Sequence, residues 1–354
     1  WRGLWCERSA VPCARALHPG SLRHRRSGGL PMRALTRSQP VLQLARASLL
    51  LGSGLRALLG IYAACFFSSS VVVGGLVLGA TLLEPRAGLL GMLGALGGVA
   101  SARVLGLVRK HEPATGFAYS ALFMGLGAGH TFADPVAALA LTALGAAATV
   151  LLTVSMQSVL ARFALPPLSV PFLIVYMCAL SMGRALGAHW ALPTAAALPE
   201  LALLPMHVRA FFEALGAFLF TVRADAGMLV FAAFCFSSPR AALCAVLGYT
   251  LCVGGAHALH VAPGLSFAAA LNATVSAVFL GMSSPRAGWQ AYVRASAGAL
   301  LCLLFTLGLA GPLGRLELSP LSLPFNLSIY TALLIERQRQ QPLARYMTPR
   351  KAQG

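Results

Sequence analysis

Two stretches of the chain carry nearly the same eight residues, Leu165-Pro-Pro-Leu-Ser-Val-Pro-Phe172 and Leu318-Ser-Pro-Leu-Ser-Leu-Pro-Phe325. They lie 153 residues apart and are identical at six of the eight positions. Collinear matches at a constant separation predict an internal duplication of the whole fold. Further matches at or next to this separation are Arg56 with Arg209, Phe67 with Phe220, Gly74 with Gly227, and Pro85-Arg-Ala with Pro239-Arg-Ala.

The composition between these stretches is typical of a membrane protein. Hydrophobic residues make up 58% of the chain and charged residues 10%, whereas soluble domains carry about 25% charged residues. The apolar residues form long runs such as Pro135–Leu160 and Ala297–Leu309. About 20 apolar residues cross a bilayer as a helix, and the 36 glycines suit close helix packing in lipid. We therefore expect a multi-pass protein surrounded by a lipid bilayer.

The net charge of +18 does not indicate nucleic acid as a partner. The arginines lie between the apolar runs and near the two ends of the chain, as in the cytoplasmic loops of membrane proteins. This pattern predicts a cell (inner or plasma) membrane protein with both termini cytoplasmic. No Cys-x-x-Cys pair occurs, and His257 and His260 lack an evident third ligand. We therefore predict no metal and no cofactor.

Each duplicated unit divides into six apolar segments. The fourth segment of each is too short to cross a ~30 Å hydrocarbon core, which predicts a re-entrant half-helix. The fold predicted is all-α and polytopic, with two inverted repeats of five transmembrane helices plus one re-entrant half-helix each. Inversion follows from the odd number of spans and puts a solute site near the midplane between the repeats. The segments are 42–68, 70–84, 87–108, 116–129, 134–162 and 168–188, then 196–222, 225–238, 239–259, 265–281, 285–314 and 318–335.

The repeats also set the domain boundaries. Residues 1–31 are rich in arginine and lack the apolar core of a secretory signal, so we interpret them as a disordered or non-native N-terminal extension before a natural start at Met32. The first transmembrane repeat is expected over 32–190 and the second over 191–335. Residues 336–354 are expected to form a cytoplasmic C-terminal tail.

Several of these residues resemble the urea transporters of bacteria and animal cells. The two eight-residue stretches are similar to the family's twice-repeated Leu-Pro-x-Leu-Thr-x-Pro-Phe. Leu271-Asn272-Ala273 resembles the family's Gly-Phe-Asn run in the second half-helix, and Tyr119-Ser120-Ala121 is a weaker first copy. The resemblance covers about Leu55 to Ile335. It also includes Phe66-Phe67, Leu219-Phe220 and the turn Ser237-Ser238-Pro239.

The resemblance implies a homotrimer with one continuous pore in each protomer and no energy coupling. In that family a narrow slot of Phe and Leu side chains holds flat urea, and a ladder of oxygen acceptors takes its N–H groups. The family's midplane threonines correspond here to Ser169 and Ser322. The slot walls carried over are Phe67, Tyr119, Phe123, Phe220, Leu271 and Val275.

The sequence departs from the family pattern at polar positions. Ala64 and Ala217 stand where the family usually has Gln or Glu, and Ser120 stands at the Asn of the first half-helix. Leu271 and Tyr119 each replace a Phe. Because two polar contacts are missing, we expect weaker selectivity for urea and easier passage of larger amides.

Each assignment has a structural alternative. Phe67 and Phe220 could be core or lipid-facing, and the two motif serines could bond back to helix carbonyls. Asn272 could brace its helix rather than touch solute. Glu213, an acidic residue inside a span, could lie at a pore mouth or pair with Arg209 one turn away.

We compare three function classes. The leading hypothesis is passive transport of urea or a related small neutral amide. The second is an ion-coupled secondary transporter of a small solute, for which Glu213 is the main support. A membrane enzyme is not predicted, because the sequence shows no paired carboxylates, His-Glu-x-x-His or Ser/His/Asp cluster with catalytic spacing.

Overall fold

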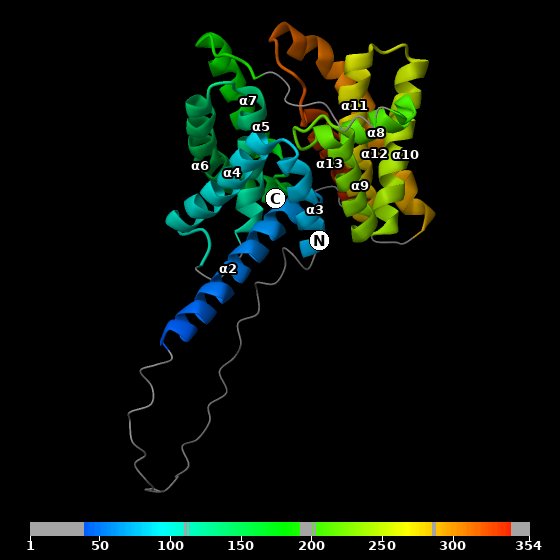
Figure 1. Cartoon of the computed structure of the whole chain (residues 1–354). Coiled ribbons are helices and arrows are strands. Elements are labelled where there is room, and N and C mark those ends of the chain that lie inside the picture. Colours follow the sequence, from blue (N-terminus) through cyan, green and yellow to red (C-terminus); the bar gives the residue numbers. More distant parts are fainter. Residues whose placement is uncertain are drawn as a thin grey trace, which may run out of the picture. The chain divides into compact units, whose positions relative to one another are not determined.

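The computed structural model describes residues 39–109, 112, 114–191, 201, 203–284 and 288–340 (Figure 1). The predicted extension 1–31 and the tail after residue 340 lie outside the described residues. The chain divides into two units, Trp1–Gly54 and Leu55–Gly354. The described part of the first unit is the beginning of one helix, and the second unit contains everything else discussed below.

Helices form nearly all of the described chain, and each predicted apolar segment contains one. The prediction of an all-helical fold is therefore confirmed. The helices are α2 (Gln39–Ala64), α3 (Val71–Leu82), α4 (Pro85–Val104), α5 (Thr115–Thr131), α6 (Pro135–Leu160), the 3-10 turn η1 (Ala161–Phe163), α7 (Val170–Ala185), α8 (Met206–Ala217), α9 (Ala224–Ser237), α10 (Pro239–Ala258), α11 (Pro263–Met282), α12 (Trp289–Arg315) and α13 (Leu323–Gln340).

Proline sets the beginning of several helices. Pro85, Pro135, Pro239 and Pro263 each stand at the first position of a helix, where the missing N–H costs nothing and the fixed φ angle suits the helix. The residue before the proline completes the start at α10, where the side chain of Ser238 accepts a hydrogen bond from the N–H of Arg240 at 3.2 Å. The Ser-Ser-Pro turn thus ends α9 and begins α10.

The two halves share unusual backbone as well as helix order. Outside glycine, a left-handed backbone conformation is uncommon, yet it recurs here at residues 153 positions apart, which we call equivalent residues. The shared conformations occur between α2 and α3, between η1 and α7, and at the matching places of the second half. The pairs are Phe67 and Phe220 (φ 60° and 61°), Ala164 and Glu317 (51° and 54°), and Leu168 and Leu321 (45° and 45°).

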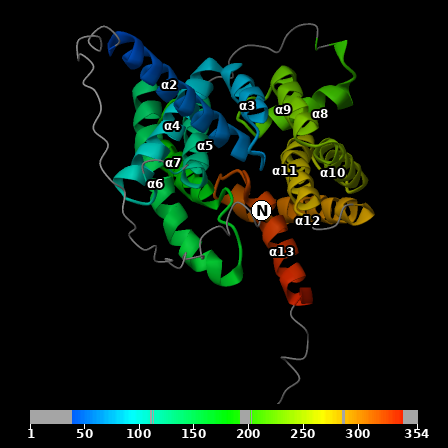
Figure 2. The same ribbon diagram turned by 90° about the horizontal axis from the view of Figure 1, so that it is seen from below.

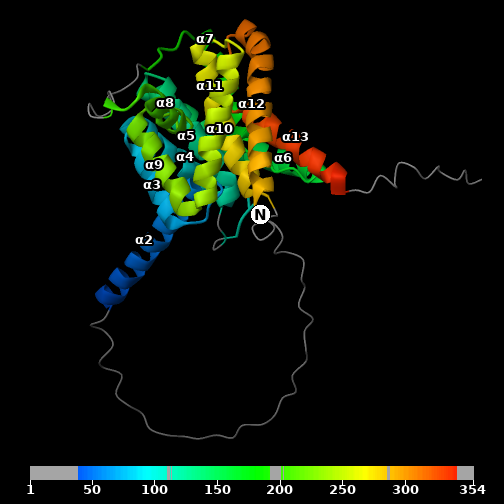
Figure 3. The same ribbon diagram turned by 90° about the vertical axis from the view of Figure 1, so that its right-hand side faces the viewer.

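Helix packing also follows the same plan in both halves. α5 packs against α4 and α6, and α11 packs against α10 and α12 (Figures 2 and 3). α3 and its counterpart α9 pack against each other. Gly74 and Gly227 are equivalent, and at each the hydrogen in place of a side chain lets a neighbouring helix approach closely. A Cβ there would overlap the carbonyl oxygen of Leu59 or Phe212, which are themselves equivalent.

The helix lengths correct one sequence prediction. Five stretches of the described chain are long and apolar enough to cross a membrane: α4, α6 with η1, α10, α11 and α12. The half-helix predicted over 265–281 is wrong by this criterion, because α11 begins at Pro263 and runs for 20 residues. The shortest apolar helices are instead α3 and α9, with 12 and 14 residues, or about 18–21 Å at 1.5 Å per residue.

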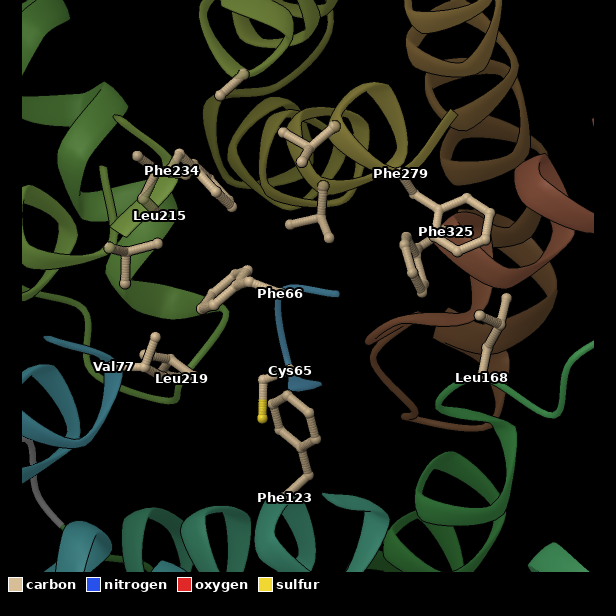
Figure 4. Close-up of a cluster of buried hydrophobic side chains, with 14 of the residues drawn as sticks. Cys65, Phe66, Val77, Phe123, Leu168, Leu215, Leu219, Phe234, Phe279 and Phe325 are labelled. Carbon is tan, nitrogen blue, oxygen red and sulfur yellow. The ribbon is translucent and has the colours of Figure 1, made fainter. Parts of the chain in front are cut away.

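Aromatic side chains join the two halves. The ring of Phe66 lies 5.2 Å from that of Phe218 and 5.0 Å from that of Phe234, measured between ring centres. Figure 4 shows Phe66 in the middle of this cluster, with Phe123 on one side and second-half residues on the other. The pair of Phe66 and Phe234 meets edge to face, and such aromatic pairs add to the stability gained from burial.

Candidate functional site

A cavity lies at the junction of the two halves. It offers about 70 Å³ to the centres of water-sized molecules, several times the ~10–15 Å³ that one water needs on this measure. Its walls are mainly aromatic and aliphatic, with two hydroxyls and one amide. The lining residues are Phe123, Ser169 and Phe172 from the first half, and Ala217, Phe218, Phe220, Leu271, Asn272, Leu321 and Ser322 from the second.

The two motif serines meet at this cavity. The hydroxyl of Ser169 donates a hydrogen bond to Oγ of Ser322 at 3.0 Å. Each serine follows a leucine in the left-handed conformation, Leu168 or Leu321, and directly precedes α7 or α13. The hydrogen bonds that Ser169 Oγ makes are to Ser322 and Asn326, so it does not bond back to a helix carbonyl.

Side chains from α5 and α11 brace the two left-handed leucines. The hydroxyl of Tyr119 donates to the carbonyl oxygen of Leu168, and Nδ2 of Asn272 donates to that of Leu321 at 2.7 Å. Tyr119 and Asn272 are equivalent residues, so the donors occupy the same place in both halves. Asn272 therefore has the bracing role, and it also lines the cavity.

The register of the first half differs from the sequence prediction at one residue. The sequence resemblance aligns Ser120 with the half-helix asparagine, whereas the structure puts Tyr119 in the place of Asn272. Ser120 is fully buried and does not line the cavity. The reason is that α5 and α11 keep the 153-residue separation of the motif, which the local similarity of Ser120-Ala121 and Asn272-Ala273 obscures.

The aromatic wall is held mainly by edge-to-face contacts. The ring of Phe220 lies 6.0 Å from that of Phe172 and 5.5 Å from that of Tyr176. Phe123 lies 5.6 Å from Phe172 and 5.3 Å from Phe218. Phe172 also stacks on Tyr176, with ring centres 5.2 Å apart. These contacts fix the rings and make the wall beside the serines apolar.

Several residues selected from the sequence lie elsewhere. Phe67, predicted as a slot wall, packs its ring against Phe279 at 4.8 Å. Val275 is fully buried, and Ala64 is half-buried. Tyr119 braces Leu168 and is half-buried. The lining of the cavity includes none of these four residues.

Glu213 pairs with Arg209, one of the two alternatives open from the sequence. Its Oε1 lies 3.4 Å from Nε of Arg209, and both side chains are partly exposed. Glu213 does not line the cavity. Among the described residues, no group of three or more His, Cys, Asp or Glu could hold a metal ion.

Sequence reasoning also missed four residues at or beside the site. Phe172 and Leu321 belong to the repeated stretches, and Phe218 precedes a selected aromatic by two positions, so the repeat itself could have found them. Asn326 does not line the cavity itself, but its side chain donates a hydrogen bond to Ser169, which does. Its only signal was a polar residue directly after the motif, where the first half has Leu173.

A duplicated set of apolar helices around a small cavity, lined by hydroxyls and aromatic rings, is typical of multi-pass membrane proteins that transport solutes. A family model described as urea transporter matches residues 55–337. Since this match covers most of the chain, the protein belongs to the urea transporter family, which is a family of transporters and channels and not of enzymes. A search of the curated proteins found no match.

Proposed function

We propose that this protein lets urea or a related small neutral amide cross the membrane passively, through a pore that includes the cavity at the junction of the two repeats. The observation that carries the proposal is the hydroxyl pair of Ser169 and Ser322, which lines the same cavity as the rings of Phe123, Phe172 and Phe220.

This arrangement suits a flat, neutral, polar solute. An amide that leaves water loses its hydrogen bonds, and a polar group left unpaired costs about 1–3 kcal/mol. Ser169 and Ser322 can replace some of those bonds, while the apolar walls make the entry of a charged solute very unfavourable. The few polar groups also keep binding weak enough for the solute to leave.

We further propose that the two repeats, 32–190 and 191–335, are inverted relative to each other. The support is that equivalent parts meet: α3 packs on α9, and Ser169 bonds to Ser322. Such self-paired contacts are expected around an approximate two-fold axis. We count α3 and α9 as too short to cross, which leaves five crossings in each repeat. An odd number of crossings in each repeat puts that axis in the membrane plane.

The remaining features follow the family. We propose a homotrimer in the cell (inner or plasma) membrane, with a separate pore in each protomer and with both termini cytoplasmic. The alternative of ion-coupled transport rested on Glu213, which pairs with Arg209 and does not line the cavity. No observation in the described residues favours that alternative.

Flux into proteoliposomes tests the proposal. We expect urea and acetamide to equilibrate faster than in protein-free vesicles, with ammonium excluded, and with no change when a proton or sodium gradient is imposed. Accumulation of urea against its own gradient under either ion gradient would contradict passive transport. Rates of urea and acetamide equal to those of protein-free vesicles would contradict the solute class.

A further inference from the structure

Asn326 is a buried amide directly behind the serine pair. It lies in the first turn of α13 and is 1% exposed. Its Nδ2 donates to Oγ of Ser169 at 2.9 Å and to the carbonyl oxygen of Ser322 at 2.6 Å. It therefore contacts both motif stretches at once.

The equivalent residue of the first half carries no amide. It is Leu173, which is also buried. The backbone N–H of Leu173 donates to the carbonyl oxygen of Ser169 at 2.9 Å, and that of Asn326 donates to the carbonyl oxygen of Ser322 at 3.1 Å. The two positions thus share their backbone geometry and differ in side chain. Among the residues that the structure describes, the only side-chain amide that donates to a hydroxyl of the serine pair therefore comes from the second half.

The contacts fix which way the amide of Asn326 faces. A carbonyl oxygen only accepts hydrogen bonds, so the side-chain atom next to the carbonyl of Ser322 must be Nδ2. Oδ1 then faces away, where it is buried and has no hydrogen-bond partner within the described residues. The donor group of the amide is therefore committed to the serine pair.

This amide gives the hydrogen bonds of the pair a direction. Nδ2 of Asn326 donates to Ser169, and the hydroxyl of Ser169 donates to Ser322. A hydroxyl that accepts a bond becomes a better donor in the next one, so this direction is favoured over its reverse. The hydroxyl proton of Ser322 is then not used in the bond between the two serines, and Ser322 lines the cavity.

We propose that Asn326 is a positioning residue for solute selection. It acts through Ser169 to keep the O–H of Ser322 for the cavity, so that this proton is not used in the bond between the two serines. Resting on the proposed passage of amides, this inference means that the cavity selects solutes whose carbonyl oxygen can accept that proton. Thiourea has nearly the shape of urea but a sulfur atom that is a weaker acceptor, so it is the matched probe.

The test compares urea and thiourea flux in proteoliposomes containing the full chain. In Asn326→Leu, which copies the side chain of the first half, the serine pair loses its preferred direction. We expect urea flux to fall by about two- to tenfold, the equivalent of one hydrogen bond at the barrier, and thiourea flux to fall less. The ratio of urea to thiourea flux therefore decreases. Asn326→Ala, which is smaller and cannot clash, gives the same change if the leucine variant does not fold.

A reciprocal exchange separates positioning from a merely structural role. Asn326→Leu combined with Leu173→Asn moves the amide to the equivalent place in the first half and reverses the chain, so that Ser169 presents its O–H. Because Ser169 also lines the cavity, the flux ratio should return toward that of the unsubstituted protein. The inference is overturned if the ratio of urea to thiourea flux is unchanged in the folded single variants, or does not recover in a folded double variant. Normal urea flux in the same variants leaves the proposed function standing. An unsubstituted protein that passes neither solute contradicts both.

Discussion

The two halves of the molecule build the same junction with different side chains. On the first side a phenol, Tyr119, holds the carbonyl of Leu168, and on the second side an amide, Asn272, holds that of Leu321. Both leucines have a φ angle of 45°. The comparison teaches that the duplication has kept the backbone and the need for a donor, whereas the identity of the donor has changed.

The surface that faces the cavity is less symmetric than the backbone. Seven of its ten lining residues come from the second half, and the amide behind the serines comes from that half too. We therefore expect paired substitutions to affect stability alike in the two halves and to affect selectivity mainly in the second.

The largest expected effect is on the shared glycine contact. Gly227→Ala puts a Cβ into the carbonyl oxygen of Phe212, and Gly74→Ala does the same at Leu59. Backbone atoms cannot move aside cheaply, so each variant should lose about 3 kcal/mol or more of stability, measured by thermal unfolding in detergent. Gly254→Ala is the control, because its Cβ would meet no atom within 4 Å. A first-half variant as stable as the control would break the equivalence of the halves.

The next largest effect on stability is expected at Tyr119 and Asn272, which hold the carbonyl groups of the two left-handed leucines. Tyr119→Phe and Asn272→Leu each leave a leucine carbonyl without its side-chain donor. We expect each to lower the free energy of unfolding by about 1–3 kcal/mol, as seen in the unfolding temperature of the purified protein. The comparison fails if only one of the two substitutions is destabilising.

Selectivity should separate the halves. Ala217 lines the cavity and its equivalent Ala64 does not, so Ala217→Gln adds a polar contact for solute while Ala64→Gln does not. We expect the ratio of urea to acetamide flux to rise by about two- to tenfold in the first variant only. An equal rise in both variants would mean that the pore is lined symmetrically.

The smallest expected effect concerns the ion pair of Arg209 and Glu213. Both side chains are partly exposed and lie one helical turn apart, an arrangement that contributes about 0.3–0.5 kcal/mol. Glu213→Gln should therefore change stability little and leave urea flux unchanged at every pH tested. A variant that loses flux, or loses a dependence on proton gradient, would restore the coupled-transport alternative.

Much of the fold was readable from the sequence because its signals are local or repeated. Long apolar runs predicted the helices, and the repeated motif predicted that Ser169 and Ser322 are equivalent residues. Helix lengths were harder, since α11 extends beyond the apolar window on both sides. A one-residue shift exchanged Tyr119 for Ser120, because adjacent residues of a helix point in different directions and small Ala-rich segments align about equally well at either register.

The sequence alone also could not predict which aromatic side chains line the cavity. Phe67 and Phe220 are equivalent and share a left-handed backbone, yet Phe220 lines the cavity while Phe67 packs on Phe279. Their surroundings differ because the residue equivalent to Phe279 is Leu126. Which of two equivalent rings faces a cavity depends on such distant partners, and these become visible only in the folded chain.

A reversible cross-link tests the central claim, that solute crosses at the hydroxyl pair of Ser169 and Ser322. The two oxygen atoms are 3.0 Å apart, so Ser169→Cys together with Ser322→Cys should form a disulfide on oxidation, detectable as two joined proteolytic fragments. We expect urea flux of the oxidised double variant to fall to that of protein-free vesicles and to return with dithiothreitol, while neither single variant responds to the oxidant. Full flux through a cross-linked protein, or no cross-link in a folded one, would contradict the account.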